Sequence, residues 1–230
     1  MTEAGAHRRP VRSFVLRGGR LTEGQKRALE KLWPRYGIEE GDALLDFSAV
    51  FGNSNPVVLD IGFGDGESTW QMARDRPAEN YLGVEVHRPG IGHLLIRLKE
   101  HRLENVRIAC ADAVEFVGKR IAPRSLAGVR LYFPDPWPKK RHHKRRIVQS
   151  GFVEVLADKL LTGGTLHMVT DWRPYAEFML DVMAGSSRFE NASGEGSYSP
   201  RPDWRPLTKF EKRGQKLGHE VLDLVFRRVG

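Results

Sequence analysis

The sequence has 230 residues and one cysteine, and its 37 Lys and Arg against 29 Asp and Glu give a formal net charge of +8. No apolar run is long enough to cross a membrane, residues 1–20 lack the apolar stretch of a secretory signal, and a lone Cys110 excludes an internal disulfide and a cysteine-based zinc site. We therefore expect a cytoplasmic protein without membrane association, and the excess positive charge favours a polyanionic partner.

The basic residues are concentrated in two blocks. Residues 1–36 carry a net charge of +6, and residues 139–146 (KKRHHKRR) carry another +6. Residues 37–138, which lie between these blocks, carry a net charge of −4. The sum of +8 therefore hides an acidic segment between two basic ones, and only the basic blocks favour contact with a polyanion.

In chain order, a basic arm and short helix over 1–36 are followed by a single domain over 37–230. Apolar runs alternate with amphipathic stretches, which predicts an α/β fold with a doubly wound, mostly parallel sheet and helices on both faces. Such a sheet binds ligands at the carboxyl ends of its strands. Strands are expected over 57–61, 81–86, 106–110, 129–133, 165–170 and 221–229, and helices over 25–36, 67–76, 91–102, 113–120, 147–161 and 174–183, with a loop over 193–207.

A glycine-rich turn, DIGFGDG over 60–66, follows the first predicted strand. Gly62 and Gly64 let the backbone turn tightly and approach a ligand, and the next helix offers free N–H groups there. A dinucleotide fingerprint would need a third glycine at position 67, where the chain has Glu67. The turn therefore indicates a different nucleotide ligand, or a connection that binds nothing.

Four carboxylates, those of Asp60, Glu85, Asp112 and Asp135, follow or end four of the predicted strands. Glu85 lies where an acid can accept hydrogen bonds from a ribose. Carboxylates gathered in one crevice repel each other unless the ligand is a cation. This favours S-adenosylmethionine, which carries a sulfonium, over a nicotinamide dinucleotide with its anionic pyrophosphate.

The fourth predicted strand leads into FPDPWP over 133–138 and then into the basic run over 139–146. Three prolines fix the directions of Asp135 and Trp137, which suits stacking on a base and hydrogen bonding to its edge. The basic run lies beside this loop, so we expect phosphate contacts that orient a nucleic acid. The adjacent His142 and His143 do not match a helical metal pair, and no metal is expected.

Together these motifs resemble the bacterial tRNA guanine-N7 methyltransferases, a family of S-adenosylmethionine-dependent enzymes. The resemblance covers nearly the whole chain after the first ten residues, and its most specific part is 133–146. Further matching stretches are 12–14, 19–22, 60–66, 170–172, 174–176, 207–211, 213–214 and 218–219. Many members have Glu where this chain has Asp60, so the contact made by this shorter side chain is expected to be weaker or water-mediated.

The resemblance implies a class I methyltransferase fold, Rossmann-like, with an antiparallel C-terminal strand. It implies methyl transfer to N7 of a guanosine at position 46, in the variable loop of tRNA, by a monomer or homodimer without an obligate protein partner. Donor binding is expected at Asp60, Gly62, Gly64, Glu85, Asp112 and Asp135, with Asp135 also catalytic. Substrate binding is expected at Lys139, Asp171, Thr208, Lys209, Phe210 and Glu211, and RNA contacts at Arg141, His142, His143, Lys144, Arg145 and Arg146.

Two other functions stay open at this point. Asp135-Pro136-Trp137 loosely resembles the acid–proline–aromatic motif of methyltransferases that act on an exocyclic base nitrogen. A non-catalytic RNA-binding protein with a vestigial nucleotide fold would bind RNA without binding a methyl donor. Trp172 and Trp204 are expected to be packing residues.

Overall fold

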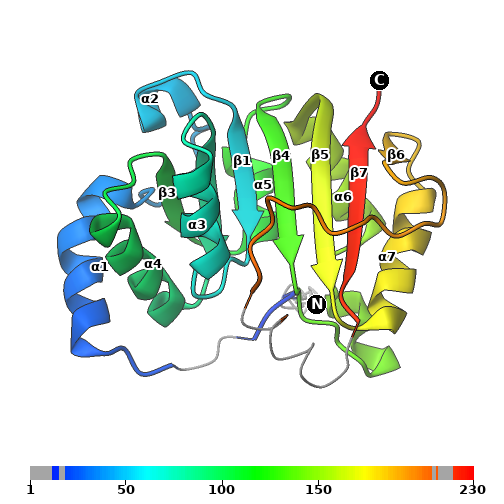
Figure 1. Ribbon diagram of the computed structural model, residues 1–230, viewed down its shortest axis with the longest axis horizontal. Helices are drawn as coiled ribbons and strands as arrows, with labels where there is room; N and C mark the ends of the chain where they lie inside the picture. Colours follow the sequence, from blue (N-terminus) through cyan, green and yellow to red (C-terminus); the bar gives the residue numbers. More distant parts are fainter. Residues whose placement is uncertain (1–11, 16–18, 209–210, 212–219) are drawn as a thin grey trace, which may run out of the picture.

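The computed structural model describes residues 12–15, 19–208, 211 and 220–230. Within this part of the chain, seven strands form one sheet in the order β3-β2-β1-β4-β5-β7-β6. Neighbouring strands from β3 to β5 are parallel, while β7 is antiparallel to both β5 and β6. The predicted α/β fold, with its mostly parallel sheet and antiparallel C-terminal strand, is confirmed (Figure 1).

Six of the seven strands overlap the predicted apolar runs, and the short β6 was not predicted. The strands are β1 (Val57–Ile61), β2 (Asn80–Glu85), β3 (Val106–Cys110), β4 (Leu126–Tyr132), β5 (Leu160–Thr170), β6 (Phe189–Asn191) and β7 (Leu222–Arg228). All five residues of β1 are buried, as expected for a central parallel strand covered on both faces. From β1, successive strands are added first on one side (β2, β3) and then on the other (β4, β5). This reversal of the strand order between β1 and β4 creates the crevice where such folds bind ligands.

Helices cover both faces of the sheet, as Figure 1 shows. They are α1 (Glu23–Tyr36), α2 (Phe47–Phe51), α3 (Glu67–Asp75), α4 (Arg88–Glu100), α5 (Ala113–Arg120), α6 (Ser150–Lys159) and α7 (Arg173–Ala184), with a 3₁₀ helix η1 (Lys140–Arg145). One core cluster contains buried residues of α1, α3 and α4, and the other contains residues of α2, α5, α6 and α7. The domain boundary expected after residue 36 stays a prediction.

Several predicted boundaries were wrong. The helix expected over 147–161 is shorter, because α6 ends at Lys159 and β5 begins directly at Leu160, which pairs with Leu126. A buried apolar residue fits a helix and a strand equally well, so periodicity could not mark this change. The short elements α2, β6 and η1 were missed for a different reason: each has too few residues to show a hydrophobic period.

The segment between β6 and β7 crosses the face of β4, β5 and β7 that α3 leaves uncovered (Figure 1). Most of the predicted loop over 193–207 is confirmed as a segment without helix or strand, apart from an isolated bridge between Ser199 and Asp223 of β7. Because a loop and not a helix covers this part of the sheet, buried side chains of the loop must hold it against the strands. Among the described residues, no helix combines the length and the apolar character that a membrane crossing requires.

Candidate active site

A cavity of about 610 Å³ lies at the carboxyl ends of β1, β2 and β4. It falls within the usual size range of small-molecule sites, roughly 300–1,000 Å³. Five carboxylates contribute to its lining, and no lysine or arginine is among the described residues that line it; the acids are Asp60, Asp65, Glu67, Glu85 and Asp135. The cavity is therefore acidic, at the strand ends where the sequence predicted a cation-binding crevice.

The glycine-rich turn forms one wall of this cavity. Gly62 and Gly64 have φ angles of 67° and 62°, in the left-handed region that favours glycine. A Cβ at either position would meet nothing within 4 Å, so both positions leave open space towards the cavity. Gly66 serves a different purpose, because a Cβ there would lie 2.7 Å from the side chain of Leu94 in α4.

Glu85 holds the glycine-rich turn in place. Its Oε2 accepts from the backbone N–H of Gly64 at 2.9 Å. Its Oε1 accepts from the N–H groups of Val86 and His87 at 2.7 and 2.9 Å. A carboxylate has about four lone-pair sites, so about one stays available for a ribose hydroxyl. The predicted donor-binding role of Glu85 is therefore combined with a structural one.

Asp60, at the end of β1, is almost completely buried at 2% exposure and still contributes to the cavity lining. Its Oδ2 accepts from the Thr69 hydroxyl at 2.7 Å. Burial raises the pKa of the Asp60 carboxyl, and the nearby Glu85 carboxylate acts in the same direction. Asp112 lies between Ala111 and Ala113, which line the cavity, but its carboxylate caps α5 by accepting from Val114 N–H at 3.0 Å.

Donor affinity should therefore depend on pH through Asp60. As pH falls through the raised pKa, Asp60 loses its charge and attracts a sulfonium less, so affinity should fall at higher pH than an ordinary carboxyl, with pKa about 3.9, would cause. Calorimetric dissociation constants for S-adenosylmethionine between about pH 7 and pH 5 measure this effect. Asp60→Asn should bind more weakly and flatten the profile, and an unchanged profile would contradict the assignment.

Asp135 lines the cavity from an exposed position on the loop after β4. The loop is strained on both sides of this residue, since Phe133 and Trp137 have φ angles of 52° and 43°. Side chains other than glycine rarely adopt this region, and such strain costs roughly 1–3 kcal/mol and concentrates at functional sites. The strained loop thus presents the Asp135 carboxylate at the cavity mouth.

The N-terminal segment Arg12–Val15 lies against this loop. Trp137 Nε1 donates to the Ser13 carbonyl at 3.1 Å, and Arg145 Nη2 donates to the Phe14 carbonyl at 3.0 Å. The Arg145 guanidinium lies 3.8 Å from the centroid of the Trp137 ring. Ser13, Phe14 and Val15 consequently form part of the cavity wall, far in sequence from the other lining residues.

Comparisons with known proteins agree with this geometry. Residues 54–224 match the family model described as "Putative methyltransferase". A tRNA (guanine-N(7)-)-methyltransferase of Aeromonas hydrophila is 54% identical over 227 residues, which cover 99% of this chain and 96% of the relative. Another, from Alcanivorax borkumensis, is 54% identical over 226 residues, 98% of this chain and 95% of the relative. The chain belongs to the tRNA (guanine-N7-)-methyltransferase family.

Solved structures of lower similarity share the fold of this family. The 16S rRNA methyltransferase KamB is 16% identical, with a TM-score of 0.56 over 94% of this chain and 99% of that one. A geranyl diphosphate C-methyltransferase from Streptomyces coelicolor, solved in complex with S-adenosyl-L-homocysteine, is 14% identical with a TM-score of 0.51, covering 89% of this chain and 76% of that one. The class I methyltransferase fold is therefore confirmed.

The residues that resemblance to the family assigns to substrate do not all lie together. Thr208 lines the cavity. Asp171 is exposed directly after β5, and Lys139 is exposed directly before η1. Lys209 and Phe210 lie outside the described residues. Glu211 is only 1% exposed, and both of its carboxylate oxygens accept from the Arg205 guanidinium. The substrate roles stay predictions, and Glu211 has a buried partner that the sequence did not reveal.

The basic run divides into internal and exposed residues. Arg146 is 4% exposed, donates through Nε to the Pro136 carbonyl at 2.9 Å, and lies over the rings of Tyr175 and Phe178. Burial lowers its pKa. The exposed members of the run are Lys139, Lys140, Arg141 and Lys144, and His142 and His143 are half-buried. Arg145 and Arg146 therefore hold the loop after β4 and the N-terminal segment together, and the exposed members are left free to meet RNA.

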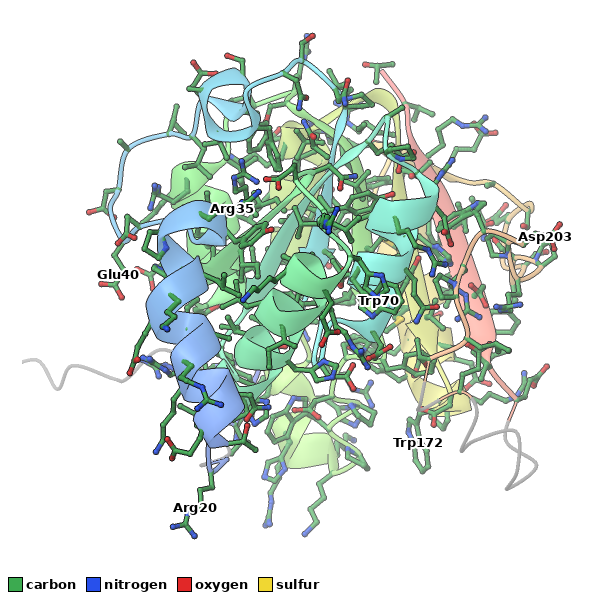
Figure 2. All side chains as sticks on the ribbon, turned by 60° about the vertical axis from the view of Figure 1, so that its left-hand side comes forward. Arg20, Arg35, Glu40, Trp70, Trp172 and Asp203 are labelled. Atoms are coloured by element: carbon green, nitrogen blue, oxygen red, sulfur yellow. The ribbon has the colours of Figure 1, made fainter. Side chains whose placement is uncertain are left out.

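Two features were missed at the sequence level. Gly90, in the first turn of α4, lies so close to the glycine-rich turn that a Cβ there would be 1.9 Å from the Gly64 carbonyl oxygen. Trp172, expected to be a packing residue, is 43% exposed and projects from the same edge of the molecule as Arg20 (Figure 2). The packing prediction was wrong for Trp172, which is the N-cap residue of α7 and leaves much of its side chain in solvent. Trp204 is also 41% exposed but contacts Arg76 and Arg130.

Proposed function

We propose that this protein transfers a methyl group from S-adenosylmethionine to N7 of a guanosine in tRNA, at position 46 of the variable loop. The observation that carries the proposal is an acidic cavity lined by Asp135, on a loop that leads directly into a run of exposed Lys and Arg residues over 139–144. Membership of the tRNA (guanine-N7-)-methyltransferase family supports the same substrate. We infer that the protein works in the cytoplasm, where tRNA is modified.

The residues of the cavity fit the methyl donor. Open space over Gly62 and Gly64 allows close approach to the backbone, and Glu85 keeps an acceptor site for a ribose hydroxyl. The carboxylates of Asp60 and Asp135 suit a cation, and no lysine or arginine among the described lining residues opposes them. When bound, S-adenosylmethionine supplies a methyl group on a positively charged sulfur.

Guanine N7 carries a lone pair and no proton, so its methylation needs no general base. The new N–C bond uses that lone pair, the S–C bond breaks with its electrons left on sulfur, and the positive charge passes to the purine ring. The main task of the chain is therefore alignment, which can supply roughly 7–11 kcal/mol. The role we propose for Asp135 is to accept from the N1–H and amino edge of the guanine, or to offset charge on its ring.

Incubation of unmodified tRNA with labelled methyl donor, followed by nuclease digestion and mass spectrometry, tests the proposal. N7-methylguanosine from the variable loop is the expected product. A methyl group on an exocyclic nitrogen would instead favour the alternative class of methyltransferase. RNA binding without calorimetric binding of S-adenosylhomocysteine would favour a non-catalytic RNA-binding protein.

The exposed members of the basic run should set the salt dependence of tRNA binding. Replacing Lys140, Arg141 or Lys144 by Gln should reduce the slope of log K against log salt by about 1 each, through lost phosphate contacts. Donor binding, which relies on the cavity, should respond much less to salt. Titrations of labelled tRNA at several salt concentrations measure the slope.

Lys99→Gln is the matched control for these variants. Lys99 is exposed in the last turn of α4, whose first turn, at Pro89 and Gly90, lines the cavity. Its replacement should leave the slope unchanged. Equal salt sensitivity of donor and tRNA binding, or an equal effect of Lys99→Gln, would contradict the assignment.

A further inference from the structure

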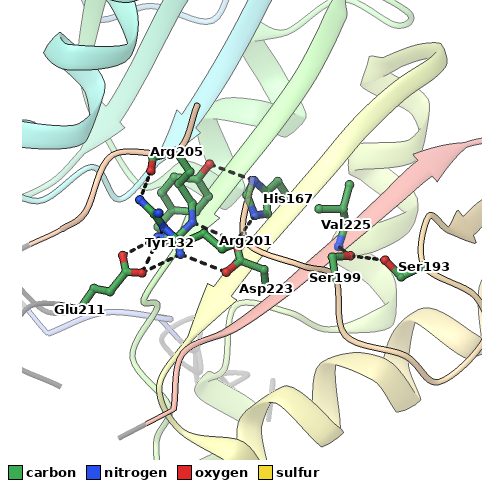
Figure 3. Close-up of polar contacts among 9 residues, drawn as sticks. All are labelled: Tyr132, His167, Ser193, Ser199, Arg201, Arg205, Glu211, Asp223 and Val225. Atoms are coloured by element: carbon green, nitrogen blue, oxygen red, sulfur yellow. Dashed lines mark hydrogen bonds and ion pairs between the residues drawn. The ribbon is translucent and has the colours of Figure 1, made fainter. Parts of the chain in front are cut away.

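The loop between β6 and β7 is anchored by a completely buried arginine. Arg205 has 0% exposure and belongs to the segment that crosses β4, β5 and β7 in Figure 1. Its Nη1 donates to Glu211 Oε2 at 2.7 Å, and its Nη2 donates to Glu211 Oε1 at 2.9 Å. Figure 3 shows this bidentate pair, a geometry in which one guanidinium matches both oxygens of a carboxylate.

The same guanidinium also engages the sheet. Arg205 Nη2 donates to Asp223 Oδ2 at 3.0 Å, and Arg205 Nε lies 2.9 Å from Asp223 Oδ1. Asp223, in β7, is 2% exposed and Glu211 is 1% exposed. Arg201, which is partly exposed, lies 3.3 Å from Glu211 Oε1 and adds a second positive charge at the rim. Arg205 is the partner that the two buried carboxylates share, so removing its guanidinium would take an ion-pair partner from both, which is strongly destabilising for the local structure.

The network continues to the wall of the cavity. His167 Nε2 lies 2.7 Å from Asp223 Oδ1, and the Tyr132 hydroxyl lies 3.0 Å from His167 Nδ1 (Figure 3). Burial lowers the pKa of His167, which favours the neutral ring. In that state Nε2–H donates to Asp223, and Nδ1 accepts from Tyr132, which lines the cavity. Hydrogen bonds and ion pairs therefore connect Glu211, through Arg205, Asp223 and His167, to Tyr132 in the cavity wall.

In the sequence, Thr208 lies halfway between Arg205 and Glu211. It lines the cavity, and its Oγ1 accepts from the Glu211 N–H at 3.1 Å. The ion pair joins residues six positions apart, so it closes the segment that contains Thr208. The position of Thr208 at the cavity mouth thus depends on Arg205 being fixed to Asp223 on one side and to Glu211 on the other.

We propose that Arg205 is a positioning residue for the tRNA substrate, and that the Glu211 carboxylate acts through it rather than by touching the substrate. Together, Arg205, Glu211 and Asp223 form a buried clamp that holds Thr208 at the cavity mouth. Glu211 cannot serve both as a clamp and as a ligand, because contact with tRNA would remove a buried partner from Arg205. The inference rests on the proposed function, since it concerns the substrate side of the same site.

A double-mutant cycle on tRNA methylation tests the clamp. Glu211→Gln keeps the shape of the side chain, and Arg205→Lys keeps a buried positive charge but loses the bidentate fork. Each variant should raise KM for tRNA roughly tenfold, with kcat reduced less and the calorimetric dissociation constant for S-adenosylhomocysteine within about twofold of the unaltered protein. The KM of the double variant for tRNA should be no higher than that of the more impaired single variant, because both changes break the same clamp.

Arg227→Gln is the matched control, since Arg227 is exposed in β7 at the end remote from the cavity. It should leave KM for tRNA unchanged. If the effects of Glu211→Gln and Arg205→Lys on KM multiply, Glu211 contacts tRNA independently and the clamp is overturned. Equal loss of donor affinity and kcat in the single variants would also overturn it, because that result indicates general damage to the fold. Failure of the proposed function is recognised separately, by absence of tRNA methylation in the unaltered protein.

Discussion

An alanine at position 90 is expected to weaken donor binding roughly a hundredfold, although residue 90 contributes no side-chain chemistry. Its Cβ would lie 1.9 Å from the Gly64 carbonyl oxygen, and the nearest atoms belong to backbone that cannot rotate away. Either the first turn of α4 or the glycine-rich turn must shift, and Gly64 is also held by Glu85. Calorimetry with S-adenosylhomocysteine measures the loss.

Gly118→Ala is the control for this substitution. Gly118 lies within α5, and a Cβ there meets nothing within 4 Å. Alanine favours a helix interior by roughly 0.5–1 kcal/mol over glycine, so this variant should melt slightly higher and bind donor normally. Normal donor binding by Gly90→Ala would show that the close approach of α4 to the glycine-rich turn is dispensable.

Asp135→Asn is expected to lower kcat for tRNA methylation roughly a hundredfold, the usual scale for losing one preorganised electrostatic group. Asparagine keeps the size of the side chain but replaces one acceptor oxygen with a donor and removes the negative charge that we propose faces the purine ring. Either orientation of this exposed amide lacks the negative charge, so rotation of the side chain cannot compensate. Single-turnover kinetics with saturating donor isolate the chemical step.

Asp171→Asn is the comparison for this variant. Asp171 is exposed at the end of β5 and is also predicted to bind substrate. Its replacement should act on KM for tRNA more than on kcat, because it lies outside the described cavity lining. Near-full methylation by Asp135→Asn, with unchanged donor affinity, would mean that the carboxylate at position 135 is not needed.

The predictable parts of the structure are those fixed by neighbours in the sequence. The apolar run 57–61 and the following glycines define a buried strand and its turn locally, and Glu85 and Asp135 are placed at the cavity because parallel strands end at one edge. The direct change from α6 to β5 at Leu160 was not predictable, because both states bury the same apolar residue.

The rest of the site depends on pairings that periodicity cannot reveal. His167 and Asp223 are separated by 56 positions and meet only because β7 pairs with β5. Arg141 and Arg146 have the same side chain in one basic run, yet the first is exposed and the second is buried under Pro136. Gly90 gave no signal, because the helix was predicted to begin at residue 91 and the reason for this glycine is a contact with a distant turn.

The place of β7 in the sheet has a consequence for biosynthesis. It follows β6 in the chain but lies between β5 and β6, so β5 keeps an unpaired edge until residues 222–228 have been made. Asp223 arrives with the same strand, so until then Arg205 lacks its ion pair with the sheet. A nascent chain can therefore assemble its donor cavity from β1, β2 and β4 before its substrate side has an anchor. Folding should therefore complete the acidic wall of the cavity first and anchor the Thr208 side last.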